Sequence, residues 1–67
     1  MLKITINGES RQFPETLSVA GLIDALAYTG KRIAVELNGE IVPKSQHATT
    51  QLATGDQLEI VVAVGGG

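Results

Sequence analysis

The sequence predicts an α+β domain, a mixed five-stranded sheet with one main helix packed across it. Three observations lead to this fold class. Several segments alternate apolar and polar residues, as strands with one buried face do. Two Asn-Gly pairs separate such segments, and this pair is the strongest short-range signal of a hairpin turn. A single helical stripe of apolar residues lies between the two hairpins.

The first hairpin comprises residues 1–6, the turn Asn7-Gly8 and a return strand over residues 9–13. Apolar residues recur at every second position of the first strand, so we expect one of its faces to be buried. Both turn residues tolerate the positive φ angles that a two-residue hairpin turn requires. Pro14 ends the return strand, because proline has no N–H to donate to a neighbouring strand.

The helix is predicted to begin after Ser18, a residue type that commonly caps helix N-termini. Gly21 lowers its stability by up to about 1 kcal/mol relative to alanine. Gly30 is expected to end it in the left-handed conformation. The residues that face the core are spaced at i, i+3, i+4 and i+7: Val19, Leu22, Ile23 and Leu26.

The second hairpin comprises residues 33–37, the turn Asn38-Gly39 and a short strand over residues 40–42 that ends at Pro43. The last strand, residues 58–64, is apolar on most of both faces, which predicts a place near the middle of the sheet. Together with the helix, these strands form the β-grasp arrangement seen in ubiquitin. The core is expected to contain the helix stripe and the inward strand residues: Ile4, Ile6, Phe13, Val35, Ile60 and Val62.

Composition narrows the possible functions. The chain has 67 residues, no cysteine, one histidine and a net charge of −2. The absence of cysteine excludes disulfides and iron–sulfur clusters, and metal binding is not expected. A nucleic-acid binder would show a basic surface and stacking aromatics, which this composition does not predict. No apolar segment is long enough to cross a membrane, so we expect a soluble, cytoplasmic protein.

Catalytic residues are not predicted. Residues 44–54 are polar and are interpreted as a loop, with one helical turn as an alternative. Ser45 and His47 lie two positions apart in this segment, without an acid placed to orient the imidazole. We expect His47 to be a solvated loop residue. The carboxylates are scattered among strands and turns, and no pair of them has a helical spacing.

The C-terminal Gly65, Gly66 and Gly67 suggest a function. A frayed chain end is the simplest alternative explanation. We predict a domain over residues 1–64 and a flexible glycine tail over residues 65–67. Three extended residues reach roughly 10 Å, and glycine lacks the Cβ that would block a narrow channel. The terminal carboxylate of Gly67 could therefore be presented to an enzyme, with Val61 and Ala63 as a partner-docking patch beside the tail.

The sequence resembles the ThiS family, the sulfur carrier proteins of thiamin biosynthesis. The resemblance covers the whole chain and is closest in the C-terminal half. Its motifs are Asn38-Gly39-Glu40, Ile41-Val42-Pro43, Gly55-Asp56 and the apolar strand that leads into Gly65-Gly66-Gly67, with looser matches at Ile6 to Glu9 and Ser18 to Leu26.

The resemblance implies that the protein is a co-substrate and performs no catalysis itself. An E1-like adenylating enzyme would use ATP to activate the carboxylate of Gly67, while Gly65 and Gly66 thread the partner's active site. A cysteine desulfurase or persulfide relay would then supply sulfur, giving a thiocarboxylate that thiazole synthase uses. The carrier would hold no cofactor of its own.

Other functions remain open at this point. The same fold and glycine end suit sulfur carriers for molybdopterin or for tRNA thiolation, and proteins conjugated to lysines as ubiquitin is. A β-grasp domain that binds partners without covalent chemistry is an alternative of a different class. An independent small enzyme is the least favoured, because no catalytic site is predicted.

Overall fold

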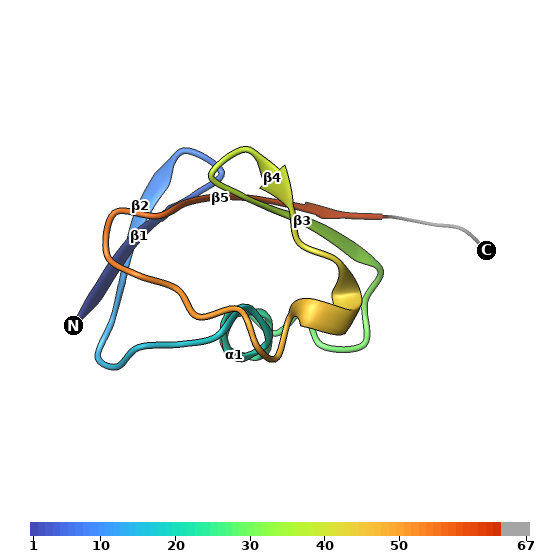
Figure 1. Cartoon of the computed structure of the whole chain (residues 1–67), viewed down its shortest axis with the longest axis horizontal. Helices are drawn as coiled ribbons and strands as arrows, with labels where there is room; N and C mark the ends of the chain where they lie inside the picture. Colours follow the sequence, from blue (N-terminus) through green and yellow to red (C-terminus); the bar gives the residue numbers. More distant parts are fainter. Residues whose placement is uncertain (64–67) are drawn as a thin grey trace.

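The computed structural model describes residues 1–63. The chain forms two hairpins, a central helix and a final strand in the predicted order (Figure 1). The elements are β1 (Leu2–Ile6), β2 (Glu9–Phe13), α1 (Val19–Ala25), β3 (Ile33–Leu37), β4 (Glu40–Ile41), the 3₁₀ helix η1 (Lys44–Gln46) and β5 (Gln57–Val62).

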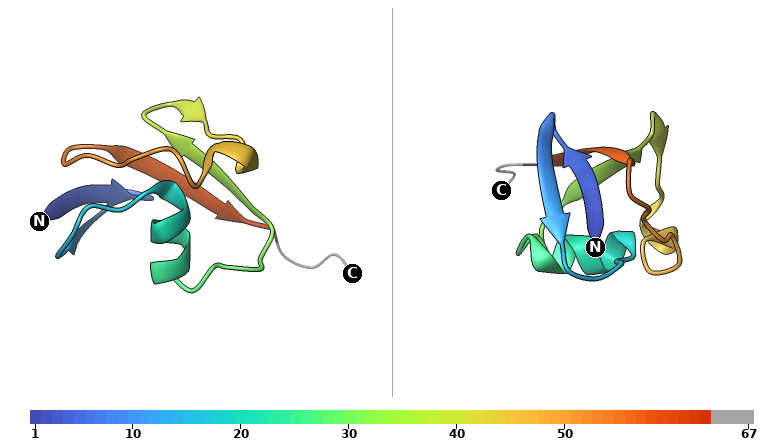
Figure 2. Two further views of the ribbon diagram at one scale, coloured as in Figure 1. Left: turned by 60° about the horizontal axis from the view of Figure 1, so that its bottom comes forward. Right: turned by 90° about the vertical axis from the view of Figure 1, so that its left-hand side faces the viewer.

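The strands form one mixed sheet in the order β2-β1-β5-β3-β4, and α1 lies across one face of it (Figures 1 and 2). β5 runs parallel to β1 and antiparallel to β3, while both hairpins are antiparallel. The predicted fold class and the central position of the last strand are therefore confirmed. β5 begins one residue earlier than predicted and ends at Val62 rather than at residue 64, which lies outside the described residues.

Both hairpin turns have the backbone conformation that their Asn-Gly pairs predict. The φ angles are 51° and 82° at Asn7 and Gly8, and 52° and 87° at Asn38 and Gly39. Two consecutive positive φ angles give the turn a twist that matches that of the flanking strands. The register within each hairpin is thereby set by its short turn.

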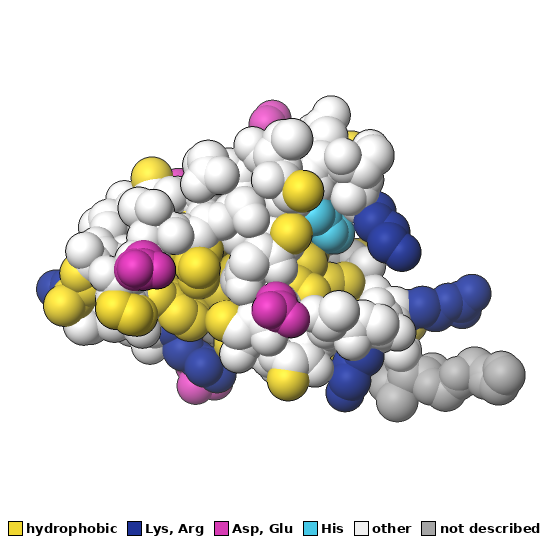
Figure 3. Space-filling model, turned by 90° about the horizontal axis from the view of Figure 1, so that it is seen from below, with side chains coloured by type: hydrophobic (Ala, Val, Ile, Leu, Met, Phe, Trp, Pro, Cys, Tyr) yellow, Lys and Arg dark blue, Asp and Glu magenta, His cyan; other side chains and the backbone are white. Residues whose placement is uncertain are grey.

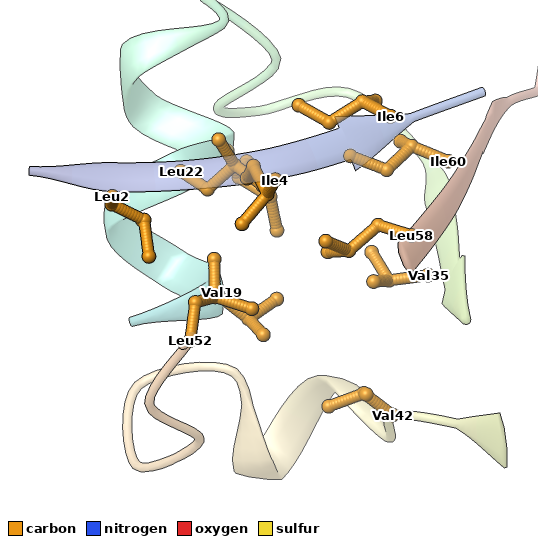
Figure 4. Packing of buried hydrophobic residues seen from close by; sticks show 11 residues of the cluster. Leu2, Ile4, Ile6, Val19, Leu22, Val35, Val42, Leu52, Leu58 and Ile60 are labelled. Carbon is orange, nitrogen blue, oxygen red and sulfur yellow. The ribbon is translucent and has the colours of Figure 1, made fainter. Parts of the chain in front are cut away.

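The core lies between the sheet and α1 (Figure 4). Four of the six strand residues predicted for it are buried, whereas Phe13 and Val62 are only partly buried. In the helix stripe, Leu26 is also only partly buried. Four core residues were absent from the predicted list: Leu2, Val42, Leu52 and Leu58. The buried cluster is Leu2, Ile4, Ile6, Val19, Leu22, Ile23, Val35, Val42, Leu52, Leu58 and Ile60.

The segment that the sequence pattern predicted as a polar loop is tied to the start of α1. The N–H groups of Val19 and Ala20 donate to the carbonyl oxygens of Thr50 (2.9 Å) and His47 (2.8 Å). These are N–H groups of the first turn of the helix, which have no partner within it. The loop therefore satisfies them and at the same time brings Leu52 into the core.

The helix begins as predicted but ends earlier. The Ser18 hydroxyl accepts the Gly21 N–H at 3.0 Å, which confirms the N-cap. Gly30 has the predicted left-handed conformation (φ 85°), but it does not end the helix, because the left-handed residue directly after the C-cap Leu26 is Ala27 (φ 62°). The Tyr28 N–H donates to Ile23 O, and the Ala27 N–H donates to Asp24 O. These two bonds define a Schellman motif, in which alanine here occupies the position that glycine usually holds.

Candidate functional site

The end of β5 leads to the predicted functional tail. β5 lies between β1 and β3, and Val62 is aligned with Ile33 of β3. Just beyond the strand, the Ala63 N–H donates to the carbonyl oxygen of Arg32 at 2.8 Å. The chain is thus held by hydrogen bonds up to residue 63. The predicted site residues Gly65, Gly66 and Gly67, and the predicted tail over residues 65–67, lie outside the described residues.

Side chains of the two turn asparagines bind the backbone of β5. The Asn7 Oδ1 accepts the Ile60 N–H at 2.8 Å, and the Asn7 Nδ2 donates to Ile60 O at 3.1 Å. In the other hairpin, the Asn38 Oδ1 accepts the Gln57 N–H at 2.9 Å. The sequence assigned both asparagines to turn formation alone. Their second role is to bind β5. For Asn7 this contact joins residues more than 50 positions apart in the sequence, so no local pattern could predict it.

The predicted docking residues lie at the surface next to the end of β5. Val61 is 63% exposed, and Ala63 is exposed as well. Val61 is aligned with the exposed Ala34 of β3, so the two apolar side chains share the outer face of the sheet, which α1 does not cover. The exposure that a docking patch requires is therefore present.

The same outer face becomes acidic farther from the chain end. Glu36 of β3 is aligned directly with Glu59 of β5. Like charges placed opposite one another in a sheet repel each other and lower stability. This face thus presents a small apolar area near residue 63 and a paired negative charge behind it.

The expectation for His47 was wrong, because its side chain is buried, with 9% exposure. Its Nε2 lies 3.0 Å from the carbonyl oxygen of Val42, and its own carbonyl accepts a hydrogen bond from α1. His47 therefore stabilises the loop, while Ser45 is exposed. Within residues 1–63, no three His, Asp or Glu side chains are grouped closely enough to hold a metal ion. In the same part of the chain, no helix has the length and apolarity needed to cross a membrane.

Known proteins resemble this chain over nearly its whole length. A thiazole synthase of Paramagnetospirillum magneticum is 46% identical over 66 residues, which are 98% of this chain but 20% of that protein. A thiazole synthase of Magnetococcus marinus is 32% identical with the same coverages. The chain thus spans about a fifth of the length of these two relatives. An uncharacterized protein, ycf40, of Porphyra purpurea is 36% identical, with 98% of this chain and 93% of that protein covered.

Solved structures show the same fold. The crystal structure of a thiamine biosynthesis protein (ThiS) from Geobacter metallireducens has a TM-score of 0.83 and 32% sequence identity, covering 98% of this chain and all of that one. An NMR solution structure of a thiamine biosynthesis protein from the same organism gives a TM-score of 0.81. Residues 4–67 match the model of the ThiS family. Since this match includes nearly every residue, the chain belongs to the ThiS family.

Proposed function

We propose that this protein is a sulfur carrier of thiamin biosynthesis whose terminal carboxylate, on Gly67, becomes a thiocarboxylate. The observation that supports this most strongly is the ThiS family match, which extends to residue 67. The similarity to solved thiamine biosynthesis proteins supports the same pathway. The carrier would act as a co-substrate of other enzymes in the cytoplasm, where reducing conditions preserve a thiocarboxylate.

Three chemical steps make up the proposed loading reaction. First, a carboxylate oxygen of Gly67 attacks the α-phosphorus of ATP, and pyrophosphate leaves, giving an acyl-adenylate. This step is needed because an ionised carboxylate is a poor electrophile at neutral pH. Second, the terminal sulfur of a cysteine persulfide attacks the acyl carbon and AMP leaves. A thiol then cleaves the resulting S–S bond as a two-electron reductant, which leaves the thiocarboxylate on the carrier.

The fold supports this role by fixing the strand that precedes the glycines. β5 is hydrogen-bonded to β1 on one side and to β3 on the other, and the Ala63 N–H donates to the carbonyl oxygen of Arg32. After Val64, the sequence continues with three residues that lack a Cβ, and they suit a channel that must admit a main chain but no side chains. An E1-like adenylating enzyme would grip the domain and act on its last residue.

Thiazole synthase is the proposed acceptor of the sulfur. In the relatives from Paramagnetospirillum magneticum and Magnetococcus marinus, a segment similar to this chain is part of a protein named thiazole synthase. Covalent linkage keeps two modules at a high effective concentration, which favours a reaction between them. This arrangement supports a direct transfer from carrier to synthase. A cysteine desulfurase or persulfide relay remains the proposed sulfur donor.

The proposal is tested by the intact mass of the protein isolated from its native host. We expect a population heavier by one sulfur-for-oxygen exchange, localised by fragmentation to the peptide that ends at Gly67. Iodoacetamide should alkylate this population, because a thiocarboxylate is a soft nucleophile. A protein that never carries the exchange, even in cells starved of thiamin, would contradict the sulfur-carrier function.

Removal of Gly66 and Gly67 separates a carrier from a non-covalent binding module. Among the described residues, the buried cluster extends from Leu2 to Ile60, so the truncated protein should keep its melting temperature. It should nevertheless fail to support thiazole formation in a reconstituted reaction. Gly67→Ala is the milder variant, and we expect it to fold normally but to be adenylated poorly. Full thiazole formation by the truncated protein would favour the binding module instead.

A further inference from the structure

A cavity of about 540 Å³ lies between the C-terminal end of α1, the start of β3 and η1. Its lining combines apolar and basic side chains from segments that are distant in the sequence. The apolar part includes a buried residue of α1 and partly buried residues on either side of the turn that follows it. The residues that carry the argument are Ile23, Tyr28 and Ile33 in the apolar part, and Lys31, Arg32 and Lys44 in the basic part.

The charge around this cavity is strongly one-sided. Three of the five Lys and Arg residues of the chain line it, and none of its described lining residues is Asp or Glu. Figure 3 shows basic side chains gathered at one end of this face, beside exposed apolar ones. The Oδ1 of Asp24 accepts a hydrogen bond from the hydroxyl of the lining residue Thr29, so one negative charge lies near the three positive ones. In a protein of net charge −2, the cavity is therefore a local positive region.

Two residues that line the cavity also contact the end of β5. The carbonyl of its lining residue Arg32 accepts the Ala63 N–H, and its lining residue Ile33 is aligned with Val62. An enzyme that takes hold of the chain beyond residue 63 must therefore approach this end of the molecule. The cavity then lies within its contact surface, on the helix side of the sheet, whereas Val61 lies on the outer side.

We propose that the cavity docks an acidic segment of the adenylating enzyme, with one apolar side chain seated against Ile23, Tyr28 and Ile33. This inference rests on the proposed function. Asp or Glu residues on either side of this apolar side chain would form ion pairs with the basic lining residues Lys31, Arg32 and Lys44. A small anion would use only the basic rim, whereas a peptide segment with both chemistries matches the whole lining.

The adenylating enzyme fits this role better than thiazole synthase does. In the two thiazole synthase relatives, the carrier-like segment is already part of the same chain, so encounter is ensured by the linkage. An activating enzyme must instead be met in solution. Opposite charges on two surfaces accelerate such encounters and select the correct partner. A basic cavity beside the end of β5 supplies this attraction.

The test is ATP–pyrophosphate exchange by the adenylating enzyme encoded in the same genome, measured against carrier concentration. The variant Lys31→Glu/Lys44→Glu reverses two exposed charges at the cavity. We expect its KM to rise by at least about tenfold while kcat is retained, because docking is weakened and the reacting atoms are unchanged. Raising the salt concentration should increase the KM of the original protein more steeply than that of the variant.

Lys3→Glu/Arg11→Glu is the matched control. These residues are exposed on β1 and β2, do not line the cavity, and change the net charge by the same amount. Equal KM values for the two double variants would overturn the inference, because net charge alone would then explain the effect. If Lys31→Glu/Lys44→Glu lost binding to thiazole synthase alone, measured by calorimetry, the choice of partner would be overturned. If the original protein shows no exchange at all, the proposed function itself fails.

Discussion

The side chain of Asn7 forms two hydrogen bonds with the backbone of Ile60: its Oδ1 accepts the N–H at 2.8 Å and its Nδ2 donates to the carbonyl at 3.1 Å. β1 itself ends one residue earlier, after two aligned pairs with β5. The amide of Asn7 thus takes the place of a further backbone pair. It extends the contact between these strands toward the end of β5, so a turn residue also positions the strand that precedes the predicted tail.

Asn7→Gly tests this second role. Glycine accepts the positive φ of position 7, so the turn is retained while both side-chain hydrogen bonds are lost. We expect the free energy of unfolding to fall by about 1–3 kcal/mol, measured by urea denaturation. Asn38→Gly is the matched control, because it makes the same change in the other hairpin, where the side-chain bonds are exposed. Equal losses at the two positions would contradict a special role for Asn7.

Ala27→Gly should stabilise the protein. Ala27 has a φ of 62°, a conformation that is unfavourable for every residue with a Cβ. Glycine removes this strain at the cost of a more flexible unfolded chain, so we expect a net gain of about 0.5–1 kcal/mol. Ala25→Gly, two residues earlier within α1, should instead lower stability by up to about 1 kcal/mol. Thermal unfolding followed by circular dichroism compares the two, and a destabilised Ala27→Gly variant would refute the strain argument.

Gly21→Ala should also raise stability. A Cβ at this position would lie 3.4 Å from Ser18 Oγ and 3.5 Å from the nearest atom of Leu17, both ordinary contacts. Alanine therefore gains the helix propensity that glycine lacks, about 0.5–1 kcal/mol. The same substitution at Gly55, where φ is 98°, is the control and should destabilise the protein. A lower melting temperature for Gly21→Ala would mean that the start of α1 has less room than these distances indicate.

Val61→Asp should weaken docking without harming the fold. The side chain is 63% exposed, so the change in unfolding free energy should stay within about 0.5 kcal/mol. Calorimetry should show reduced affinity for the adenylating enzyme, because a charge then occupies the apolar area next to Ala63. Ile41→Asp alters another exposed residue, on the edge strand β4, and should leave the affinity unchanged. Unaltered affinity of Val61→Asp would exclude this patch as a contact.

Sequence patterns predicted those parts of the fold that depend on local signals. The Asn-Gly turns, the Ser18 cap and the central place of the last strand all follow from short segments. The burial of His47 could not be predicted this way, since it depends on a hydrogen bond to Val42 O and on the docking of the loop against α1. The helix end was predicted wrongly because glycine usually occupies the left-handed position, which here is held by Ala27.

The candidate site was predictable to a similar degree. The exposure of Val61 and Ala63 followed from strand alternation and the central position of β5. The basic cavity was not predicted, because its lining comes from the end of α1, the turn before β3 and η1. Lys31 and Lys44 are thirteen positions apart, and only the tertiary fold brings them to one cavity.

The parallel arrangement of β1 and β5 has a mechanical consequence. The Thr5 N–H donates to Asp56 O at 3.0 Å and the Asn7 N–H to Leu58 O at 2.9 Å, so these bonds lie across the direction of both strands. A force that draws residue 63 along β5, with the opposite end of β1 held, loads them in shear, and they must rupture together rather than one after another. The domain should therefore resist unfolding when a force is applied to residue 63 along β5.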